Sequence, residues 1–142
     1  MPESEFHLSR PGRGLEVIPE ARRDGVRAGL HAVFGLSMVG EMQPIIGGVS
    51  GALILRFEVR DRAYVLRLEP KRVALPHRER GFACMAAAAE AGVAPQVYHA
   101  DPTTGVAIMD HVSGRPLSGH PGGPAGTARA LGALIAGVQA VR

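Results

Sequence analysis

The chain has 142 residues, of which 46% are apolar, and a formal charge of +3. This length accommodates one domain with a real core and is too short for two full domains. Its arginines alternate with acids over the first eighty positions, and its only aromatic residues are two tyrosines and four phenylalanines. Composition and charge therefore argue against a nucleic-acid interface, which needs clustered cations and stacking aromatic side chains.

Cysteine usage and the chain start favour a cytoplasmic protein. The single cysteine, Cys84, excludes a disulfide framework or a cysteine metal site within one chain. The first residues, MPESEFHLSR, are acidic where a signal peptide is cationic and then apolar. The apolar stretch 130–141 is too short to span a bilayer, so we expect no membrane segment.

The first half of the chain predicts one helix and three strands. Residues 1–18 are polar and read as a flexible lead, and a helix begins near Pro19 and stops at Gly35. A short strand at 42–46 precedes two strands, 53–59 and 63–69, which alternate apolar and polar residues around a tight reversal at 60–62. An antiparallel meander is the simplest arrangement.

The second half predicts a helix between Pro76 and Gly92, because proline can open a helix and glycine can cap it. Strands at 96–99 and 106–109 follow, joined by a turn, then a linker at 113–126 and a final helix at 127–142. The order predicts an α+β fold with a five-stranded antiparallel sheet and one helix packed across it. The lobe that holds this sheet spans 19–112.

A glycine-rich turn, GGVSG at residues 47–51, separates the first two strands. Glycines let backbone amides approach a phosphate closely, and the Ser50 hydroxyl adds a donor. The turn lacks the GK[ST] of a Walker loop, and Ala52 excludes a GxSxG nucleophile elbow. From these residues alone the turn is either a phosphate cradle or an ordinary hairpin.

Arg67 places a permanent charge in an apolar strand, on the face that carries Val65. A buried cation needs a partner, and Glu79 is a candidate because its spacing of three residues from Phe82 puts both on one face of the following helix. A glycine-rich hairpin, a cation on the third strand and a helical acid together form a phosphate-binding device. The alternatives are a structural ion pair and an arginine that reaches solvent at the sheet edge.

In this order the segments GGVSG, YVLR, HRERGF, GVAP and MDHVSGRPL resemble the amino-terminal lobe of the aminoglycoside phosphotransferase and choline kinase family, which has a protein-kinase-like fold. The resemblance runs from about Leu30 to Leu117. It implies binding of ATP or GTP with Mg²⁺ and transfer of the γ-phosphate to a hydroxyl of a small molecule such as an aminoglycoside or choline. Position 51 departs from the pattern, with Gly in place of the family's Asn.

The resemblance also implies roles for individual residues. The loop would cover the nucleotide, Arg67 would contact the α and β phosphates, and Glu79 would hold Arg67. Val65 would line the adenine pocket, Met109 would stand at its back, and the main chain at the hinge would bond the base edge. The implied nucleotide-binding residues are Gly47, Gly48, Val49, Ser50, Gly51, Val65, Arg67, Glu79, Met109, Asp110 and Val112.

The family's HxDxxxxN loop and metal-binding aspartate lie in a second, helical lobe, and neither motif occurs in these 142 residues. The His99-Ala-Asp101 triplet has HxD spacing, but Val106 stands where the asparagine belongs, and a turn ahead of Pro102 explains the segment. We therefore expect no catalytic residue, no metal ligand and no phosphate transfer by these residues alone. The final helix resembles the first helix of the second lobe.

A different class of function is a non-catalytic module that binds a nucleotide and associates with a complementary lobe or with itself. The surface meant for the second lobe would then be apolar and exposed. The residues leave open the acceptor, the choice of ATP or GTP, and whether the chain is a fragment or a standalone module.

Overall fold

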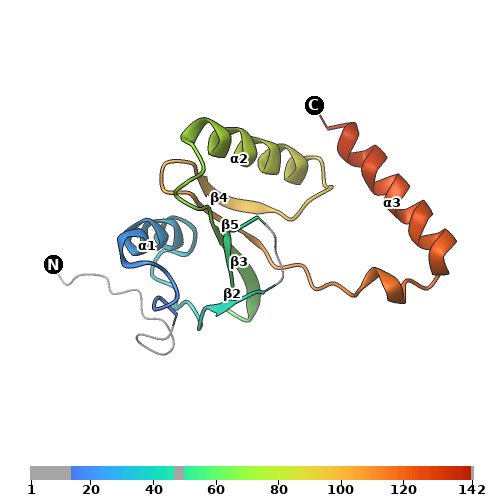
Figure 1. The fold of residues 1–142 in the computed structure, drawn as a ribbon. Coiled ribbons are helices and arrows are strands. Elements are labelled where there is room, and N and C mark those ends of the chain that lie inside the picture. The colour runs from blue at the N-terminus through green and yellow to red at the C-terminus, as the bar shows by residue number, and fades with distance from the viewer. Residues whose placement is uncertain (1–13, 47–49, 142) are drawn as a thin grey trace.

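The computed structural model describes residues 14–46 and 50–141 (Figure 1). Its elements follow the chain as α1 (Glu20–Phe34), β1 (Gln43–Pro44), β2 (Leu53–Val59), β3 (Arg62–Leu68), α2 (Leu75–Glu90), β4 (Val97–Asp101), β5 (Val106–Asp110), the 3-10 helix η1 (Leu117–Gly119) and α3 (Gly123–Gln139). The strands form one antiparallel sheet in the order β1-β2-β3-β5-β4. The predicted α+β class and five-stranded antiparallel sheet are confirmed.

Strands β2 and β3 form a tight hairpin that sets the register of the sheet. Arg60 and Asp61 both have positive φ, 50° and 63°, as the central residues of a two-residue turn require. The register pairs Val59 with Arg62 at the turn and Leu53 with Leu68 at the far end. Because side chains alternate between faces, every other residue of each strand points to one side of the sheet.

One face of the sheet packs against α1 and holds the main core. Even-numbered residues of β3 and β5 point to this face, and Leu66 and Ile108 are fully buried there. Arg23 donates from Nε to the carbonyl oxygens of Leu15 and Ile18, which ties the segment before α1 to the helix. The core cluster comprises Ile18, Val26, Leu30, Val39, Met42, Leu55, Phe57, Val59, Leu66, Leu68, Val106 and Ile108.

Helix α2 lies alongside β4 and covers part of the opposite face (Figure 1). It begins at Leu75 with Pro76 in its first turn, and Gly92, at φ +74°, follows its end. Phe82 is its buried anchor, with 4% of its surface exposed. Because α2 buries little else, the part of this face over β2, β3 and β5 stays open.

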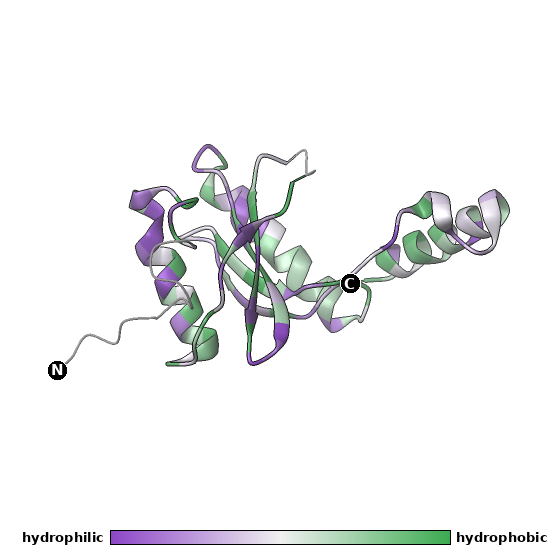
Figure 2. Ribbon diagram, turned by 90° about the horizontal axis from the view of Figure 1, so that it is seen from below, coloured by the Kyte–Doolittle hydropathy of each residue, from purple (hydrophilic) through white to green (hydrophobic). Residues whose placement is uncertain are grey.

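Helix α3 stands apart from the sheet, joined to β5 by the extended segment that contains η1 (Figure 1). It begins four residues before the expected start, at Gly123, with proline in its first turn. None of its residues is buried, and Figure 2 shows hydrophobic residues along its length. In the described part of the chain, no helix combines the length and hydropathy needed to cross a bilayer.

Candidate nucleotide-binding site

The open face of the sheet carries the Arg67 cation among several apolar side chains. Arg67 pairs in register with Ile54 on β2 and with Ala107 on β5, and Val65 pairs with Met109. The strand period places these five side chains on the face opposite the α1 core. The structure thus brings Val65, Arg67 and Met109 together on one surface, as the sequence predicts; their contact with a nucleotide stays a prediction.

Arg67 is held by Glu69, two residues further along the chain. Its Nε donates to Glu69 Oε1 at 2.5 Å, and the two side chains are 30% and 13% exposed. Residues two apart in a strand project from the same face, so an extended backbone is enough to bring the pair together. The spacing of two residues between Arg67 and Glu69 is visible in the sequence, although the predicted partner was a glutamate on the helix.

The expected pairing of Arg67 with Glu79 is wrong. Glu79 is exposed, and the described residues place no ion pair on it. The stripe of α2 that lines the cavity beside Arg67 contains His77, Arg78, Gly81, Phe82 and Met85. At about 100° per residue, Glu79 points roughly 130° away from the middle of this stripe. The helix therefore offers no carboxylate to Arg67.

A cavity of about 320 Å³ separates Arg67 from α2. At its helical wall, Gly81 has no side chain, and an added Cβ there would meet nothing within 4 Å. A carboxylate on α2 would have to cross this cavity to contact Arg67. The cavity is lined by Arg67, Glu69, Val73, His77, Arg78, Gly81, Phe82 and Met85.

The glycine-rich loop is described only from Ser50 onward, so the predictions for Gly47, Gly48 and Val49 lie outside the described residues. The Ser50 hydroxyl accepts a 3.4 Å hydrogen bond from the amide of Ala52. Gly51 has φ +74°, and a Cβ there would lie 2.6 Å from Arg72 Nη2. The positive φ favours glycine at position 51, whereas the Arg72 guanidinium ends a flexible side chain and could move aside.

Arg72 is a second cation at the loop that the sequence analysis did not identify. It follows β3 in the connection to α2, and its guanidinium lies against the backbone of Gly51. No local pattern marks it, because a cation in a polar connection is ordinary. Only the fold brings it beside the loop, where its delocalised charge suits an anionic ligand.

The hinge segment leaves β5 at Asp110. The backbone N–H of Asp110 donates to the carbonyl oxygen of Gln96 at 3.0 Å, so Asp110 can offer a base only its carbonyl oxygen. Among the described residues, none hydrogen-bonds the main chain of Val112, whose residue surface is 66% exposed. The predicted contacts of Asp110 and Val112 with a base edge stay predictions.

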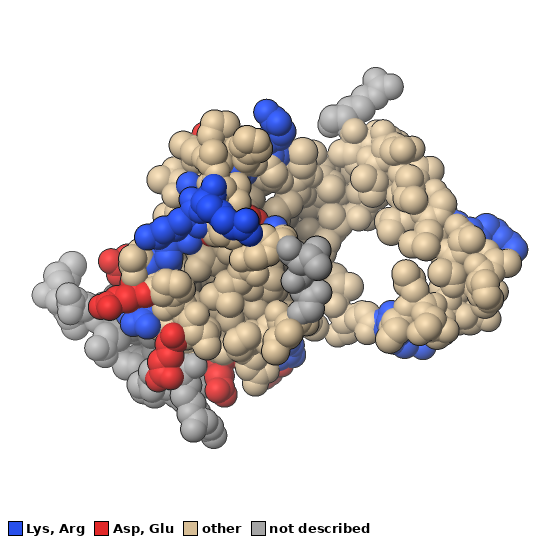
Figure 3. Space-filling model, viewed as in Figure 1, with Lys and Arg blue, Asp and Glu red and all other residues tan. Residues whose placement is uncertain are grey.

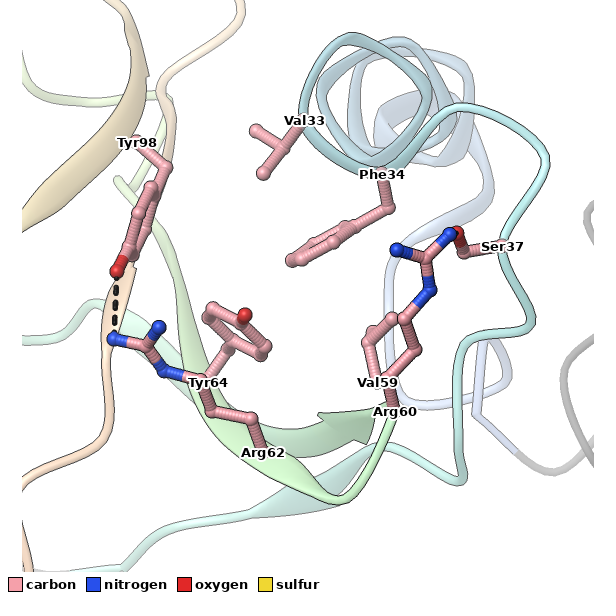
Figure 4. Close-up of a pocket in the computed structure, with 8 residues that line it drawn as sticks. All are labelled: Val33, Phe34, Ser37, Val59, Arg60, Arg62, Tyr64 and Tyr98. Carbon is pink, nitrogen blue, oxygen red and sulfur yellow. Dashed lines mark hydrogen bonds between the residues drawn. The ribbon is translucent and has the colours of Figure 1, made fainter.

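The Asp110 side chain points to the other face of the sheet and is fixed there. It accepts hydrogen bonds from Arg62 Nη2 at 2.8 Å and from the Tyr98 hydroxyl at 2.9 Å. Figure 4 shows Arg62 bridging to Tyr98 beside Tyr64, in a pocket closed by Phe34 of α1. Burial, and then the hydrogen bond and charge of Asp110, raise the pKa of Tyr98. This cluster anchors the start of the hinge.

The described residues do not fit a magnesium site. In the ranges 14–46 and 50–141, no group of three or more His, Cys, Asp or Glu residues could hold a metal ion. Glu69 is engaged by Arg67, and Asp110 by Arg62 and Tyr98. Any Mg²⁺ bound with a nucleotide would therefore need ligands other than these carboxylates.

The site is a cation on an open sheet face beside a glycine-containing loop and a hinge, within an α+β lobe.

The chain is similar to a choline/ethanolamine kinase family protein from Mesorhizobium loti, at 30% identity and a TM-score of 0.47. The match covers 71% of this chain and 34% of that protein, so the chain spans about a third of the solved relative. This finding confirms the predicted resemblance. No protein-family model matches the chain, and neither does any curated protein sequence.

Proposed function

We propose that this chain is the nucleotide-binding lobe of a small-molecule phosphotransferase. Arg67 carries the proposal: it is a half-buried guanidinium, oriented by Glu69, that lies opposite the start of β2, the strand that follows the glycine-rich loop. A guanidinium with free donors and fixed orientation suits the α and β phosphates of ATP or GTP. Arg72 at Gly51 adds positive charge where the loop would cover those phosphates.

Phosphate transfer requires more than this lobe. Catalysis in phosphoryl transfer depends on positioning, a base for the acceptor hydroxyl, and Mg²⁺. These 142 residues contain no HxDxxxxN motif. We therefore propose that this chain supplies nucleotide binding and that a complementary lobe supplies the base, the metal ligands and the pocket for an aminoglycoside, choline or similar acceptor.

Titration with MgATP and MgGTP by isothermal calorimetry tests this role. We expect saturable binding by the wild type and at least tenfold weaker binding by Arg67→Ala, about 1.4 kcal/mol. Arg27→Ala is the matched control, since it removes the same charge from an exposed position of α1 on the opposite side of the sheet. Absence of binding by the wild type, or equal affinities for the two variants, contradicts the proposal.

Exposed apolar side chains of α3 support a second role, association with a complementary lobe. Leu134 and Ile135 are 52% and 55% exposed, and Leu131 and Val138 accompany them. Contiguous apolar surface of this kind marks interaction sites in proteins. Light scattering over a concentration series separates the two modes: a monomer that binds nucleotide fits a lobe awaiting its complement, whereas a concentration-dependent dimer shows self-association.

A further inference from the structure

A second cavity, of about 400 Å³, lies between α1 and the turn that joins β4 to β5. Four separate segments build it: α1, the connection that follows β3, the first turn of α2, and the turn between β4 and β5. Figure 3 shows Lys and Arg side chains gathered over the region between α1 and α2. Its lining residues are Ala21, Arg22, Gly25, Lys71, Arg78, Thr103 and Thr104.

Three of these residues are cations without an acidic partner in the described part of the chain. The Cβ position of Gly105 lies 2.8 Å from Arg22 Nη2 and 3.2 Å from Arg78 Nη1, so the two guanidinium groups converge on one point. In the described ranges, no salt bridge pairs Arg22, Lys71 or Arg78 with a carboxylate. Like charges held this close destabilise each other unless an anion lies between them.

The nearby acids are already engaged. Asp101 accepts hydrogen bonds from the Thr103 amide at 2.9 Å and the Thr104 hydroxyl at 3.0 Å. Glu69 pairs with Arg67 in the neighbouring cavity. Burial, and then the charge of Arg78, lower the pKa of Arg22. Among the residues that the structure describes, no carboxylate forms an ion pair with the cations of this cavity.

Arg78 also has a donor without an acceptor. Its Nε is buried and makes no hydrogen bond, and its Nη1 reaches the carbonyl oxygen of Thr103 only at 3.3 Å. A buried polar group without a partner is destabilising, and a bound ion or water can supply the missing acceptor. Arginine is the side chain that binds phosphate through two parallel hydrogen bonds.

We propose that this cavity binds a phosphate group, either inorganic phosphate or the phosphate of a small monoester. A dianion would offset the charges of Arg22, Lys71 and Arg78 and accept from the free donors of Arg78. The volume of about 400 Å³ leaves room for more than the phosphate itself. The cavity adjoins the proposed nucleotide site at Arg78 but does not include Arg67.

A phosphate in this cavity would lie beside residues that hold Arg67 in place. Arg22 Nη2 donates to the Glu69 carbonyl oxygen at 2.9 Å and to the Thr104 carbonyl oxygen at 2.8 Å. The Glu69 carboxylate in turn holds Arg67. Arg78 borders both cavities. An anion that draws Arg22 and Arg78 together therefore acts on the residues that orient Arg67.

Amide chemical-shift mapping by NMR tests the proposal. The protein is titrated with sodium phosphate and, separately, with glycerol phosphate, each against sodium chloride of equal ionic strength. We expect saturating shifts at Thr103 and Thr104 in wild type. The affinity should fall at least tenfold in both Arg78→Met and Lys71→Ala, and Arg80→Ala should bind as wild type does, because it removes one charge from an exposed position of α2 outside the cavity.

The outcomes are distinct. Tighter binding of the monoester identifies a phosphorylated small molecule as the ligand, and equal or weaker binding identifies the free ion. Shifts that do not saturate, or that weaken equally in Arg78→Met and Arg80→Ala, overturn the proposal, because they reflect general attraction of anions. Loss of the shifts in Arg67→Ala also overturns it and assigns the phosphate to the nucleotide site. A wild type that fails to bind MgATP leaves this result unaffected.

Discussion

Arg67 of β3 forms an ion pair with Glu69, the residue that follows this strand, with 2.5 Å between Nε and Oε1. The pair depends on the extended backbone of β3 and the residue that follows it, and does not depend on the position of α2. The orientation of Arg67 is therefore built into the sheet. This arrangement differs from the expected pairing with Glu79, in which movement of a helix would make or break the contact.

Glu69→Gln tests the strength of this pair. We expect the free energy of unfolding to fall by about 1–2 kcal/mol, because the half-buried Arg67 loses a charged hydrogen-bond partner. Glu58→Gln is the matched control. Glu58 also pairs with an arginine two residues away, Arg56 in the same strand β2, but the Glu58 side chain is 54% exposed. That change should cost about 0–1 kcal/mol. Urea unfolding of both variants measures the difference, and equal losses would argue against a special role for Glu69.

Gly81→Ala should stabilise the protein. Gly81 lies inside α2, and an added Cβ meets nothing within 4 Å, so alanine gains about 0.8–1.0 kcal/mol of helix propensity without a clash. Gly92→Ala is the contrasting control, because Gly92 also has open space but sits at φ +74°. It should destabilise by about 1–2 kcal/mol. Thermal unfolding separates the two, and a loss of stability in Gly81→Ala would show that the cavity beside Arg67 cannot accept a methyl group.

Phe57→Ala should be among the most damaging core changes. Phe57 is fully buried on the α1 face and makes an edge contact with Phe34, with ring centroids 5.7 Å apart. Truncation of a buried phenylalanine costs about 3–5 kcal/mol. Ile46→Ala, at a position that is 95% exposed, should change stability by less than about 0.5 kcal/mol. Denaturant midpoints measure both, and a small loss in Phe57→Ala would place the core elsewhere.

Ionisation of Tyr98 should make stability depend on pH in alkaline solution. Its pKa is raised by burial and by Asp110, so the neutral phenol is favoured in the folded state. As pH rises past about 10, the unfolded chain releases this proton first. The folded state is then progressively destabilised until its own pKa is passed. Wild-type stability should therefore decline in this window, and the decline should be smaller in Tyr98→Phe.

The same cluster can be followed directly by tyrosinate absorbance, since the chain contains only two tyrosines. Tyr98→Phe assigns the Tyr98 component. Asp110→Asn should move that component to lower pH, because it removes the charge that opposes ionisation. Asp24→Asn, at a side chain that is 97% exposed on α1, should leave it unchanged. If the Tyr98 component titrates at the same pH in Asp110→Asn as in wild type, Asp110 is not a cause of the raised pKa of Tyr98.

Local sequence pattern was enough to predict the elements, because their signals are short in range. Strand alternation in β2 and β3 predicts which side chains face the core, and the structure places Leu66 in the core and Arg67 on the opposite face. The start and stop of α2 follow from Pro76 and Gly92. The beginning of α3 was misplaced, because the Gly- and Pro-rich segment before it carries no hydrophobic period.

What the sequence determined by itself is therefore the element order, the two faces of the sheet and the presence of a cation on the open face. Tertiary structure decided the partner of that cation, since the rotation of α2 about its axis depends on how Phe82 packs. It also decided that Arg22, Lys71 and Arg78 meet in one cavity. Residues so far apart in the chain carry no shared local signal, and only the path of the backbone through β3, β5 and β4 brings them together.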